Sequence, residues 1–200
     1  PTKIGDLLQA MYSYRGSPVT VAALKLAPMC FVRPGELRKA RWADIDLEAS
    51  EWRFTASKTG TPHIVPLSSQ AKEILEELQP LTKRSEFVFP GVRSAKRPMS
   101  ENTINKALRV LGYDTKVDVC SHGFRTMACS ALIESGRWSK DAVERQMSHQ
   151  ERNSVRAAYI HKAEHLDERT QMMQWWSDYL DACRLKFVAP YRYDRQVQVA

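Results

Sequence analysis

The chain has 200 residues, 43% of them hydrophobic and 26% charged, which is the composition of an ordinary globular protein with a sizeable core. No apolar run approaches the roughly 18 residues of a membrane helix, so the sequence predicts no membrane-spanning segment. The formal net charge of +7 favours polyanionic partners, although charge alone does not separate nucleic-acid-binding proteins from other basic proteins.

The first part of the chain is predicted to be helical. Residues 4–14 and 17–32 have helical spacing, and Ser17 is placed to cap the second helix. A third helix is expected to begin at Pro34, because proline fits the first helical turn. Arg33 therefore stands directly before a helix start.

The pattern changes to alternation in the middle of the chain. Residues 51–57 alternate apolar and polar side chains and are expected to form a strand, and residues 63–68 are expected to form a second one. The intervening residues 58–62, K-T-G-T-P, are predicted to be a turn by their glycine and proline. Residues 42–47 are expected to add a third strand, so the sequence predicts one small antiparallel sheet.

Helical patterns return after the sheet. A helix over 68–79 is expected to be capped by one of its first two serines, residues 89–100 are expected to be a loop, and a helix over 100–112 has Ser100 as its N-cap. The last third is predicted to contain helices at about 121–135, 139–147, 153–158 and 165–182. The predicted fold class is α+β, a mostly helical body with one small antiparallel three-stranded sheet.

The stretch C-S-H-G-F-R, residues 120–125, opens one of these helices. Ser121 is expected to cap it, and His122 and Arg125 are three residues apart, so they are neighbours on one helix face. Free backbone N–H groups in a first helical turn favour an anion, so a phosphate there would meet an imidazole and a guanidinium together. Taken alone, the pair is more simply explained as an arginine and a histidine on a surface turn.

The pair belongs to a longer ordered set of candidate catalytic residues. In chain order the set is Arg33, Lys58, His122, Arg125, His149 and Tyr159. The surrounding sequences R-P-G-E-L-R-K-A-R-W-A-D-I-D, H-G-F-R, R-A-A-Y and M-M-Q-W-W-S-D-Y-L-D resemble the tyrosine recombinase (phage integrase) family, in the form found in integrases of satellite phages and genomic islands. The resemblance covers about residues 5–182.

The resemblance implies a site-specific DNA recombinase that cleaves and rejoins DNA through a 3′-phosphotyrosyl intermediate, integrating or excising a prophage or genomic island. Tyr159 would be the nucleophile. Arg33 and Arg125 would bind the scissile phosphate, since a guanidinium contacts phosphate in a bidentate manner. His122 and His149 would donate hydrogen bonds to the same phosphate, and His122 is also the candidate base.

Two further residues complete the implied machinery. Lys58, at the tip of the predicted hairpin, would protonate the departing 5′ oxygen, and Glu36 would support Arg33 or His122 rather than react. No ATP, metal or other cofactor is implied, because the bond to tyrosine conserves the energy of the DNA backbone and the arginines supply positive charge. The four cysteines are scattered without a C-x-x-C pair, which indicates a reduced, cytoplasmic compartment, here the bacterial nucleoid.

The implied partner is double-stranded DNA at attachment sites. The candidate DNA-binding residues are basic and lie in short groups: Arg38, Lys39, Arg41, Arg93, Lys96, Arg97, Arg152 and Arg156. Family members act as tetramers on DNA, so a homotetramer is expected there, and a monomer is the alternative for this chain alone. Accessory DNA-bending or directionality proteins are further candidate partners.

The resemblance also implies a domain organisation. Residues 1–182 are expected to form the catalytic domain, and residues 183–200 a tail that is either disordered or packed on a neighbouring protomer. Nothing in the sequence resembles the amino-terminal DNA-binding domains of such integrases, so a catalytic fragment of a longer protein is expected. A smaller departure from the family pattern is Ser148, which precedes His149 where relatives often carry glycine or alanine.

Two other functions remain open on the sequence. Residues 161–165, H-K-A-E-H, match the H-x-x-E-H pattern of zinc peptidases through His161, Glu164 and His165, but an obvious third ligand is lacking. The other alternative is a DNA-binding domain that has lost its chemistry, against which the complete ordered set argues. Bound metal would identify a peptidase, and covalent attachment to DNA would separate the enzyme from the binder.

Overall fold

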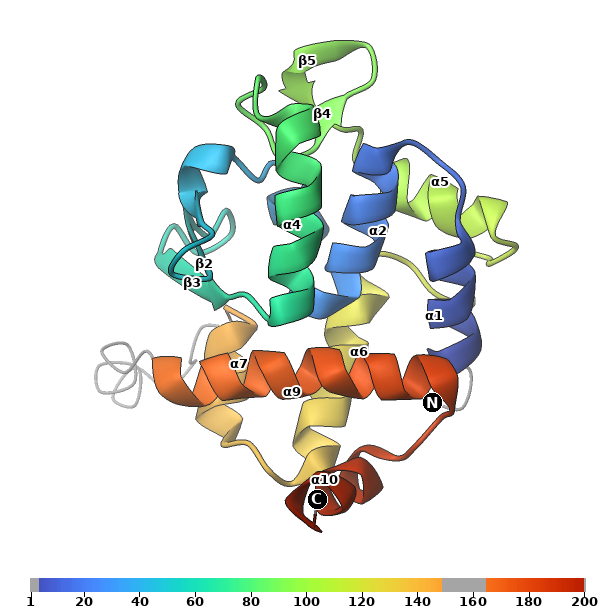
Figure 1. Cartoon of the computed structure of the whole chain (residues 1–200), viewed down its shortest axis with the longest axis vertical. Helices are drawn as coiled ribbons and strands as arrows, with labels where there is room; N and C mark the ends of the chain where they lie inside the picture. Colours follow the sequence, from blue (N-terminus) through green and yellow to red (C-terminus); the bar gives the residue numbers. More distant parts are fainter. Residues whose placement is uncertain (1–3, 149–164, 200) are drawn as a thin grey trace.

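The computed structural model describes residues 4–148 and 165–199. Its body is helical, with two small antiparallel sheets at the periphery (Figure 1). The helices are α1 (Ile4–Ser13), α2 (Pro18–Cys30), α3 (Pro34–Arg38), η1 (Trp42–Asp44, a 3-10 turn), α4 (Ser69–Thr82), α5 (Thr103–Val110), α6 (Gly123–Ser135), α7 (Lys140–Gln146), α9 (Leu166–Leu185) and α10 (Pro190–Val199). The mostly helical α+β fold class predicted from the sequence is confirmed.

The main sheet has three antiparallel strands in the order β1-β2-β3. They are β1 (Ile45–Asp46), β2 (Glu51–Thr55) and β3 (Pro62–Pro66). Trp52 pairs with Val65 and Phe54 with His63, so the predicted alternation sets the register. The expected strand over 42–47 is confirmed only at its end, because its first half forms the η1 turn.

A second sheet appears where the sequence predicted a loop. The segment 89–100 contains a two-stranded hairpin of β4 (Pro90–Gly91) and β5 (Ser94–Pro98), so the loop prediction is wrong there. Its strands are held by backbone pairing between Pro90 and Pro98 and between Gly91 and Ser94. Strand propensity missed the hairpin because it is short, mainly exposed, and contains glycine, proline and charged residues, which strands disfavour.

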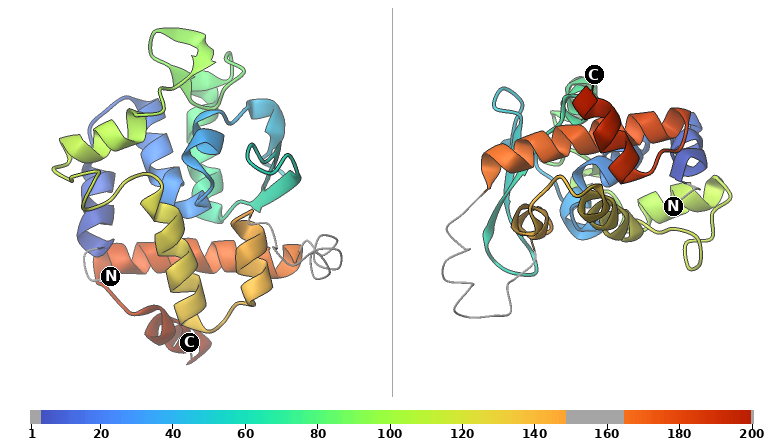
Figure 2. Two further views of the ribbon diagram at one scale, coloured as in Figure 1. Left: turned by 180° about the vertical axis from the view of Figure 1, so that it is seen from behind. Right: turned by 90° about the horizontal axis from the view of Figure 1, so that it is seen from below.

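Helix α9 runs across the molecule, with α2 and α4 above it in Figure 1 and with α6 and α7 crossing behind it, as the reverse view in Figure 2 also shows. Its apolar residues enter the core, where the Trp176 indole donates to the Pro28 carbonyl at 2.8 Å and packs edge-on against Phe31. This helix therefore joins the two halves of the body. Within residues 4–148 and 165–199, no helix is both long and apolar enough to cross a bilayer.

Helix ends follow the sequence in some places and not in others. Ser17 and Ser68 cap α2 and α4 as predicted, and Gly136 ends α6 with a left-handed φ of 71°. The predicted caps Ser100 and Ser121 are wrong, because α5 begins only at Thr103 and α6 only at Gly123. Each serine instead lies in the turn before its helix.

The segment that follows α9 lies against the same chain in this structure. The Tyr179 hydroxyl donates to the Val188 carbonyl at 2.9 Å, and Arg137 forms an ion pair with the buried Asp194 of α10 at 2.9 Å. These contacts place α10 beside α6 (Figure 2). The boundary expected at residue 182 falls inside α9, which continues to Leu185.

Candidate active site

Arg33 occupies the N-cap position of α3 and is held there by Glu36. The Arg33 backbone N–H donates to Glu36 Oε2 at 3.0 Å, and Arg33 Nη1 donates to Glu36 Oε1 at 3.1 Å. A carboxylate three residues into a helix is well placed to satisfy a free N–H at the helix start. The helix end thus fixes the direction in which the Arg33 guanidinium points.

Glu36 also reaches the sheet. Its Oε1 atom accepts from the backbone N–H and the hydroxyl of Ser57, at 3.3 and 3.4 Å. The carboxylate is only 7% exposed, so these donors replace water around a buried charge. Glu36 therefore ties Arg33 to the hairpin between β2 and β3, a link through Ser57 that the sequence did not reveal.

Lys58 follows Ser57 directly and lies in the turn of that hairpin, with an exposed side chain. The turn is closed by a bond from the Ala56 N–H to the Thr61 carbonyl at 2.9 Å, and Gly60 adopts the positive φ of 67° that it needs. The turn is thus anchored beside Arg33 through Ser57, while the side chain of Lys58 is exposed to solvent.

Arg125 is the second arginine of the site and is 4% exposed. Its Nη1 donates to the carbonyl of Phe31 and its Nη2 to the carbonyl of Met147, both at 2.7 Å. Burial lowers the pKa of the Arg125 guanidinium, the cation of Arg33 lowers it further, and the carboxylate of Glu36 opposes the change. The two arginines are therefore electrostatic neighbours inside one site.

The two guanidinium groups bind successive carbonyls of the segment that ends α7. Arg33 Nη2 donates to the Ser148 carbonyl at 3.0 Å, next to the Met147 carbonyl that Arg125 binds. Ser148 has a left-handed φ of 50°, a conformation that glycine adopts most easily because it lacks a Cβ atom. With two cations against the one carboxylate of Glu36, these three side chains carry a net charge of +1, which suits a phosphate.

His122 lies at the N-cap position of α6, with an exposed side chain, and its carbonyl accepts from the Arg125 N–H at 3.2 Å. The predicted pair thus opens the helix with one member turned to solvent and the other buried. Four predicted residues, His149, Arg152, Arg156 and Tyr159, lie outside the described residues. The same holds for His161 and Glu164 of the peptidase pattern.

A histidine that the sequence analysis did not single out lies beside this site. His63 of β3 is 2% exposed, and its Nδ1 atom is buried without a hydrogen-bond partner among the described residues. Burial and the nearby cations of Arg169, Arg145 and Arg125 lower the pKa of His63 to about 3. A hydrogen bond with the Gln146 backbone acts in the opposite direction and raises it. The sequence did contain a signal for its burial, because His63 is two residues before Val65 and therefore points to the same, buried face of β3.

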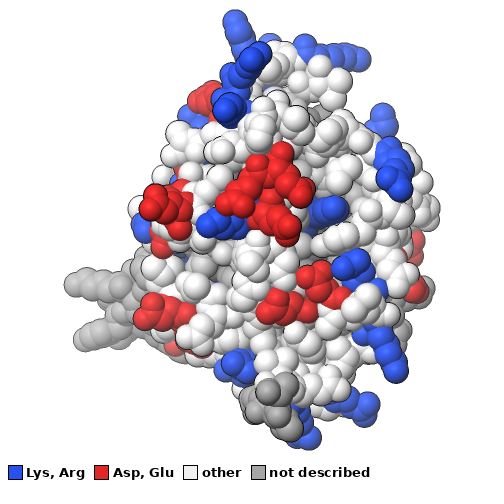
Figure 3. Space-filling model, viewed as in Figure 1, with Lys and Arg blue, Asp and Glu red and all other residues white. Residues whose placement is uncertain are grey.

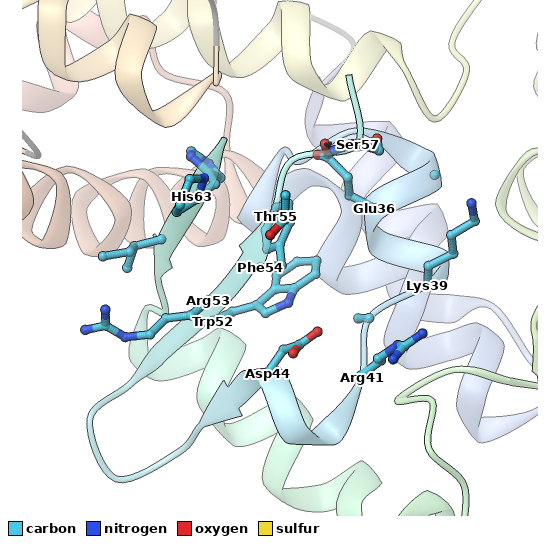
Figure 4. A pocket seen from close by; sticks show the side chains of 14 residues that line it. Glu36, Lys39, Arg41, Asp44, Trp52, Arg53, Phe54, Thr55, Ser57 and His63 are labelled. Carbon is cyan, nitrogen blue, oxygen red and sulfur yellow. Dashed lines mark hydrogen bonds between the residues drawn. The ribbon is translucent and has the colours of Figure 1, made fainter. Parts of the chain in front are cut away.

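A cavity of about 740 Å³ opens between α3, η1 and the inner face of the main sheet (Figure 4). Its lining includes Glu36 and Ser57 at one end, the aromatic rings of Trp52 and Phe54, and the exposed cation Lys39. Because Glu36 and Ser57 belong to both, the cavity is continuous with the arginine site. A polyanion crossing this region would meet positive charge on the α3 side.

The described members of the predicted DNA-binding set occupy two places. Arg38, Lys39 and Arg41 lie at and after the end of α3, where Arg41 forms an ion pair with Glu86 at 2.9 Å. The hairpin of β4 and β5 carries the exposed side chains Arg93, Lys96 and Arg97. Figure 3 shows basic side chains at this hairpin and acidic ones over α4, whose exposed glutamates are Glu73, Glu76 and Glu77.

The peptidase alternative gains no support from the described residues. His165 has a left-handed φ of 46° at the start of α9, and it lies 3.8 Å from Glu168. In residues 4–148 and 165–199, no group of three or more His, Cys, Asp or Glu side chains is arranged to hold a metal ion. The one described histidine of the pattern thus makes a local contact within the first turn of its helix.

Comparison with known proteins identifies sequence relatives. The phage integrase family matches residues 2–165. The Escherichia coli K12 protein IntB is 53% identical over 96% of this chain and 52% of its own length, and the integrase of enterobacteria phage P4 is 50% identical over 94% and 46%. The chain therefore spans about half the length of these curated relatives.

Solved structures share the fold. The integrase of mycobacterium phage Brujita superposes with a TM-score of 0.65 at 22% identity, over 85% of this chain and 55% of that one. A lambda integrase tetramer bound to a Holliday junction superposes with a TM-score of 0.54 at 18% identity, over 74% and 45%. At these identities the superpositions establish the arrangement of the helices and of the main sheet.

Proposed function

Because the chain belongs to the phage integrase family, we propose that the whole protein is a site-specific DNA recombinase, which integrates or excises a prophage or genomic island. The observation that carries the proposal is the convergence of Arg33 and Arg125 on adjacent carbonyls beside Glu36. Two guanidinium groups around a single carboxylate form a cationic site that matches a phosphodiester.

The proposed reaction is a transesterification, in which one phosphate ester is exchanged for another and no phosphate ester is hydrolysed. The Tyr159 oxygen attacks the phosphorus, its proton passes to His122, and a 3′-phosphotyrosyl bond forms. The bond to the 5′ oxygen breaks as Lys58 delivers a proton to it. Arg33 and Arg125 stabilise the charge on the non-bridging oxygens. A 5′ hydroxyl then attacks the phosphotyrosyl bond to rejoin DNA.

The supporting groups have separate proposed tasks. His149 donates a hydrogen bond to the phosphate, and Glu36 orients Arg33. The exposed position of Lys58 at a hairpin tip suits a group that enters the DNA groove after binding. Arginines supply the positive charge, so the proposed reaction uses no metal ion or cofactor.

Duplex DNA is the proposed partner. The residues proposed to contact its backbone are Arg38, Lys39, Arg41, Arg93, Lys96, Arg97, Arg152 and Arg156. The acidic surface over α4 in Figure 3 is unsuited to DNA, so we place the duplex on another face of the molecule. A similar structure is a tetramer on a Holliday junction, which supports a proposed homotetramer on DNA in the bacterial nucleoid, with accessory bending or directionality proteins.

The experiment uses the full-length protein and a nicked attachment-site duplex, on which cleavage releases a short strand and traps the adduct. We expect a protein–DNA adduct that resists detergent and is absent with Tyr159→Phe, which removes only the hydroxyl. Activity is expected to persist in excess chelator. Tight DNA binding without any adduct would instead support the DNA-binding domain that has lost its chemistry.

A further inference from the structure

A buried polar junction joins β3, α7 and α9 beside the arginine site. Arg169 is 0% exposed, and its Nε and Nη2 atoms donate to Gln146 Oε1 at 3.0 and 2.8 Å. Nη2 also donates to the Ile64 carbonyl of β3. Gln146 is itself 1% exposed. Burial of a guanidinium is costly, and pairing seldom makes it better than an apolar residue for stability alone, so its presence calls for another reason.

The junction lies at both ends of the segment that carries the proposed nucleophile. Gln146 is the last residue of α7, and Arg169 is in the first turn of α9. Residues 149–164, which include His149 and Tyr159, connect these two helices in the sequence. The bond between Gln146 and Arg169 therefore sets the distance between the points where this segment leaves one helix and enters the next.

The same junction is continuous with the phosphate-binding arginines. The carbonyls of Met147 and Ser148, directly after Gln146, accept from Arg125 and Arg33. A shift of Gln146 would carry these two acceptors with it. The orientation of both guanidinium groups and the position of α7 are thus mechanically coupled over three successive residues.

The third contact reaches the strand that leads away from the Lys58 turn. Among the described strands β3 is an edge of the sheet, so in this part of the chain the outward carbonyl of Ile64 has no strand partner, and it accepts from Arg169. His63, the preceding residue, forms a hydrogen bond with the Gln146 backbone. The hairpin is therefore attached to α7 and to α9 at one place.

We propose that Arg169 and Gln146 are positioning residues for strand cleavage, which hold the two flanks of the nucleophile segment in register with Arg33, Arg125 and the Lys58 hairpin. The inference rests on the proposed recombinase function. A planar guanidinium suits this task because its fork binds the Gln146 side chain and the Ile64 carbonyl at once, which the point charge of a lysine does less well.

A purely structural role makes a different prediction. If the junction only supported the fold, a pair of apolar side chains of similar volume could replace it without slowing cleavage by the folded protein. If it positions the reacting groups, the apolar pair keeps the fold but loses the directional bonds. The double variant Gln146→Met/Arg169→Met separates these roles, because it removes the buried charge together with the side-chain amide that binds it, although the Ile64 carbonyl loses its donor.

The experiment compares full-length variants by thermal unfolding, by DNA affinity and by the single-turnover rate of adduct formation on saturating nicked duplex. For the double variant we expect a folded protein with one cooperative thermal transition, DNA affinity within about twofold of the wild type, and adduct formation about 100-fold slower. A folded double variant that forms adduct at the wild-type rate would overturn the proposal.

Two single variants decide the question if the double variant does not fold. Gln146→Glu keeps the acceptor for Arg169 and should retain cleavage within about threefold, whereas Arg169→Lys keeps the charge without the fork and should slow cleavage about tenfold or more. Adduct formation at the wild-type rate by both Gln146→Glu and Arg169→Lys would overturn the proposal.

The matched control is Ser177→Ala, because Ser177 is a fully buried residue of the same helix whose hydroxyl pairs with Ser68 at 2.7 Å, outside the junction. This variant should lose stability without slowing adduct formation at saturating DNA. If it slowed adduct formation as much as the Gln146 and Arg169 variants do, the loss of any buried hydrogen bond in α9 would be enough to slow cleavage, and the proposal would be overturned. If the wild-type protein itself forms no adduct, the result counts against the recombinase function. If only the variants fail to form adduct, the recombinase function stands.

Discussion

The carboxylate of Glu36 holds Arg33 at two points: Oε2 accepts from the Arg33 backbone N–H at 3.0 Å, and Oε1 accepts from Nη1 at 3.1 Å. The same Oε1 accepts from Ser57, so one buried carboxylate fixes both the direction of the Arg33 side chain and the start of the turn that carries Lys58. A change at Glu36 should therefore affect catalysis more than DNA binding.

We expect Glu36→Gln to slow adduct formation about 10- to 100-fold, because the amide presents N–H groups where the site needs an acceptor and Arg33 loses its fixed direction. DNA affinity should stay unchanged or increase slightly, since a negative charge is removed. Single-turnover cleavage and a binding titration measure the two effects. Glu48→Gln changes an exposed acid in the turn after β1 and is the control, expected to leave both unchanged.

Arg125→Lys should cleave about 10²- to 10³-fold more slowly than the wild type, because lysine cannot hold the carbonyls of Phe31 and Met147 and still present a planar fork to phosphate. A carbonyl left without its donor should also reduce the free energy of unfolding by about 1–3 kcal/mol. Urea denaturation and adduct assays measure these effects. Wild-type cleavage by the lysine variant would contradict the phosphate-binding role.

Lys58→Ala should lose most cleavage of ordinary DNA but recover on a substrate with sulfur in place of the bridging 5′ oxygen. A thiolate leaves without a proton, because thiols have a pKa of about 8.5, far below that of an alcohol. The rates on oxygen and sulfur substrates provide the measurement. Tyr159→Phe is the control and should stay inactive on both. Equal losses on both substrates would mean that Lys58 is not the acid.

His63 should make stability fall as pH falls. Its pKa is lowered from the ordinary 6.5 to about 3 by burial and by neighbouring arginine cations, so the unfolded chain binds a proton that the folded chain does not. The contribution is present above about pH 6.5 and is lost as pH decreases toward 3, by about 2 kcal/mol between pH 7 and 5.

The variant His63→Phe cannot take up this proton, so its stability should fall less than that of the wild type between pH 7 and 5. Urea unfolding at a series of pH values gives both curves. Parallel curves for the two proteins would show that His63 is not held neutral in the folded state.

The basic hairpin of β4 and β5 should contribute to DNA affinity through the phosphate backbone. Replacing Arg93, Lys96 and Arg97 by alanine should weaken binding similarly on specific and random duplexes. The slope of log K against log salt should decrease by about 0.9 for each phosphate that the variant no longer neutralises. The control replaces the exposed Glu73, Glu76 and Glu77 of α4 by glutamine. An unchanged salt slope in the alanine variant would place the hairpin away from DNA.

Local signals in the sequence determined much of the secondary structure. Apolar alternation in residues 51–57 and 63–68 with the K-T-G-T-P turn is enough to specify the β2–β3 hairpin, since strand pairing there joins neighbouring segments. Ser17 and Pro18 likewise specify the start of α2. Pro34 likewise placed Arg33 directly before a helix start.

The surroundings of those residues follow from the packing of segments that are far apart in the chain. The partners of Arg125 are the carbonyls of Phe31 and Met147, 94 and 22 residues away in the chain, and no helical or strand period encodes such contacts. The sequence analysis did not single out Arg169, which is fully buried against Gln146. Hydrophobic periodicity predicts which face of a helix or strand is buried. The packing of α7, α9 and β3 decides which polar group from another element contacts a charge on that face.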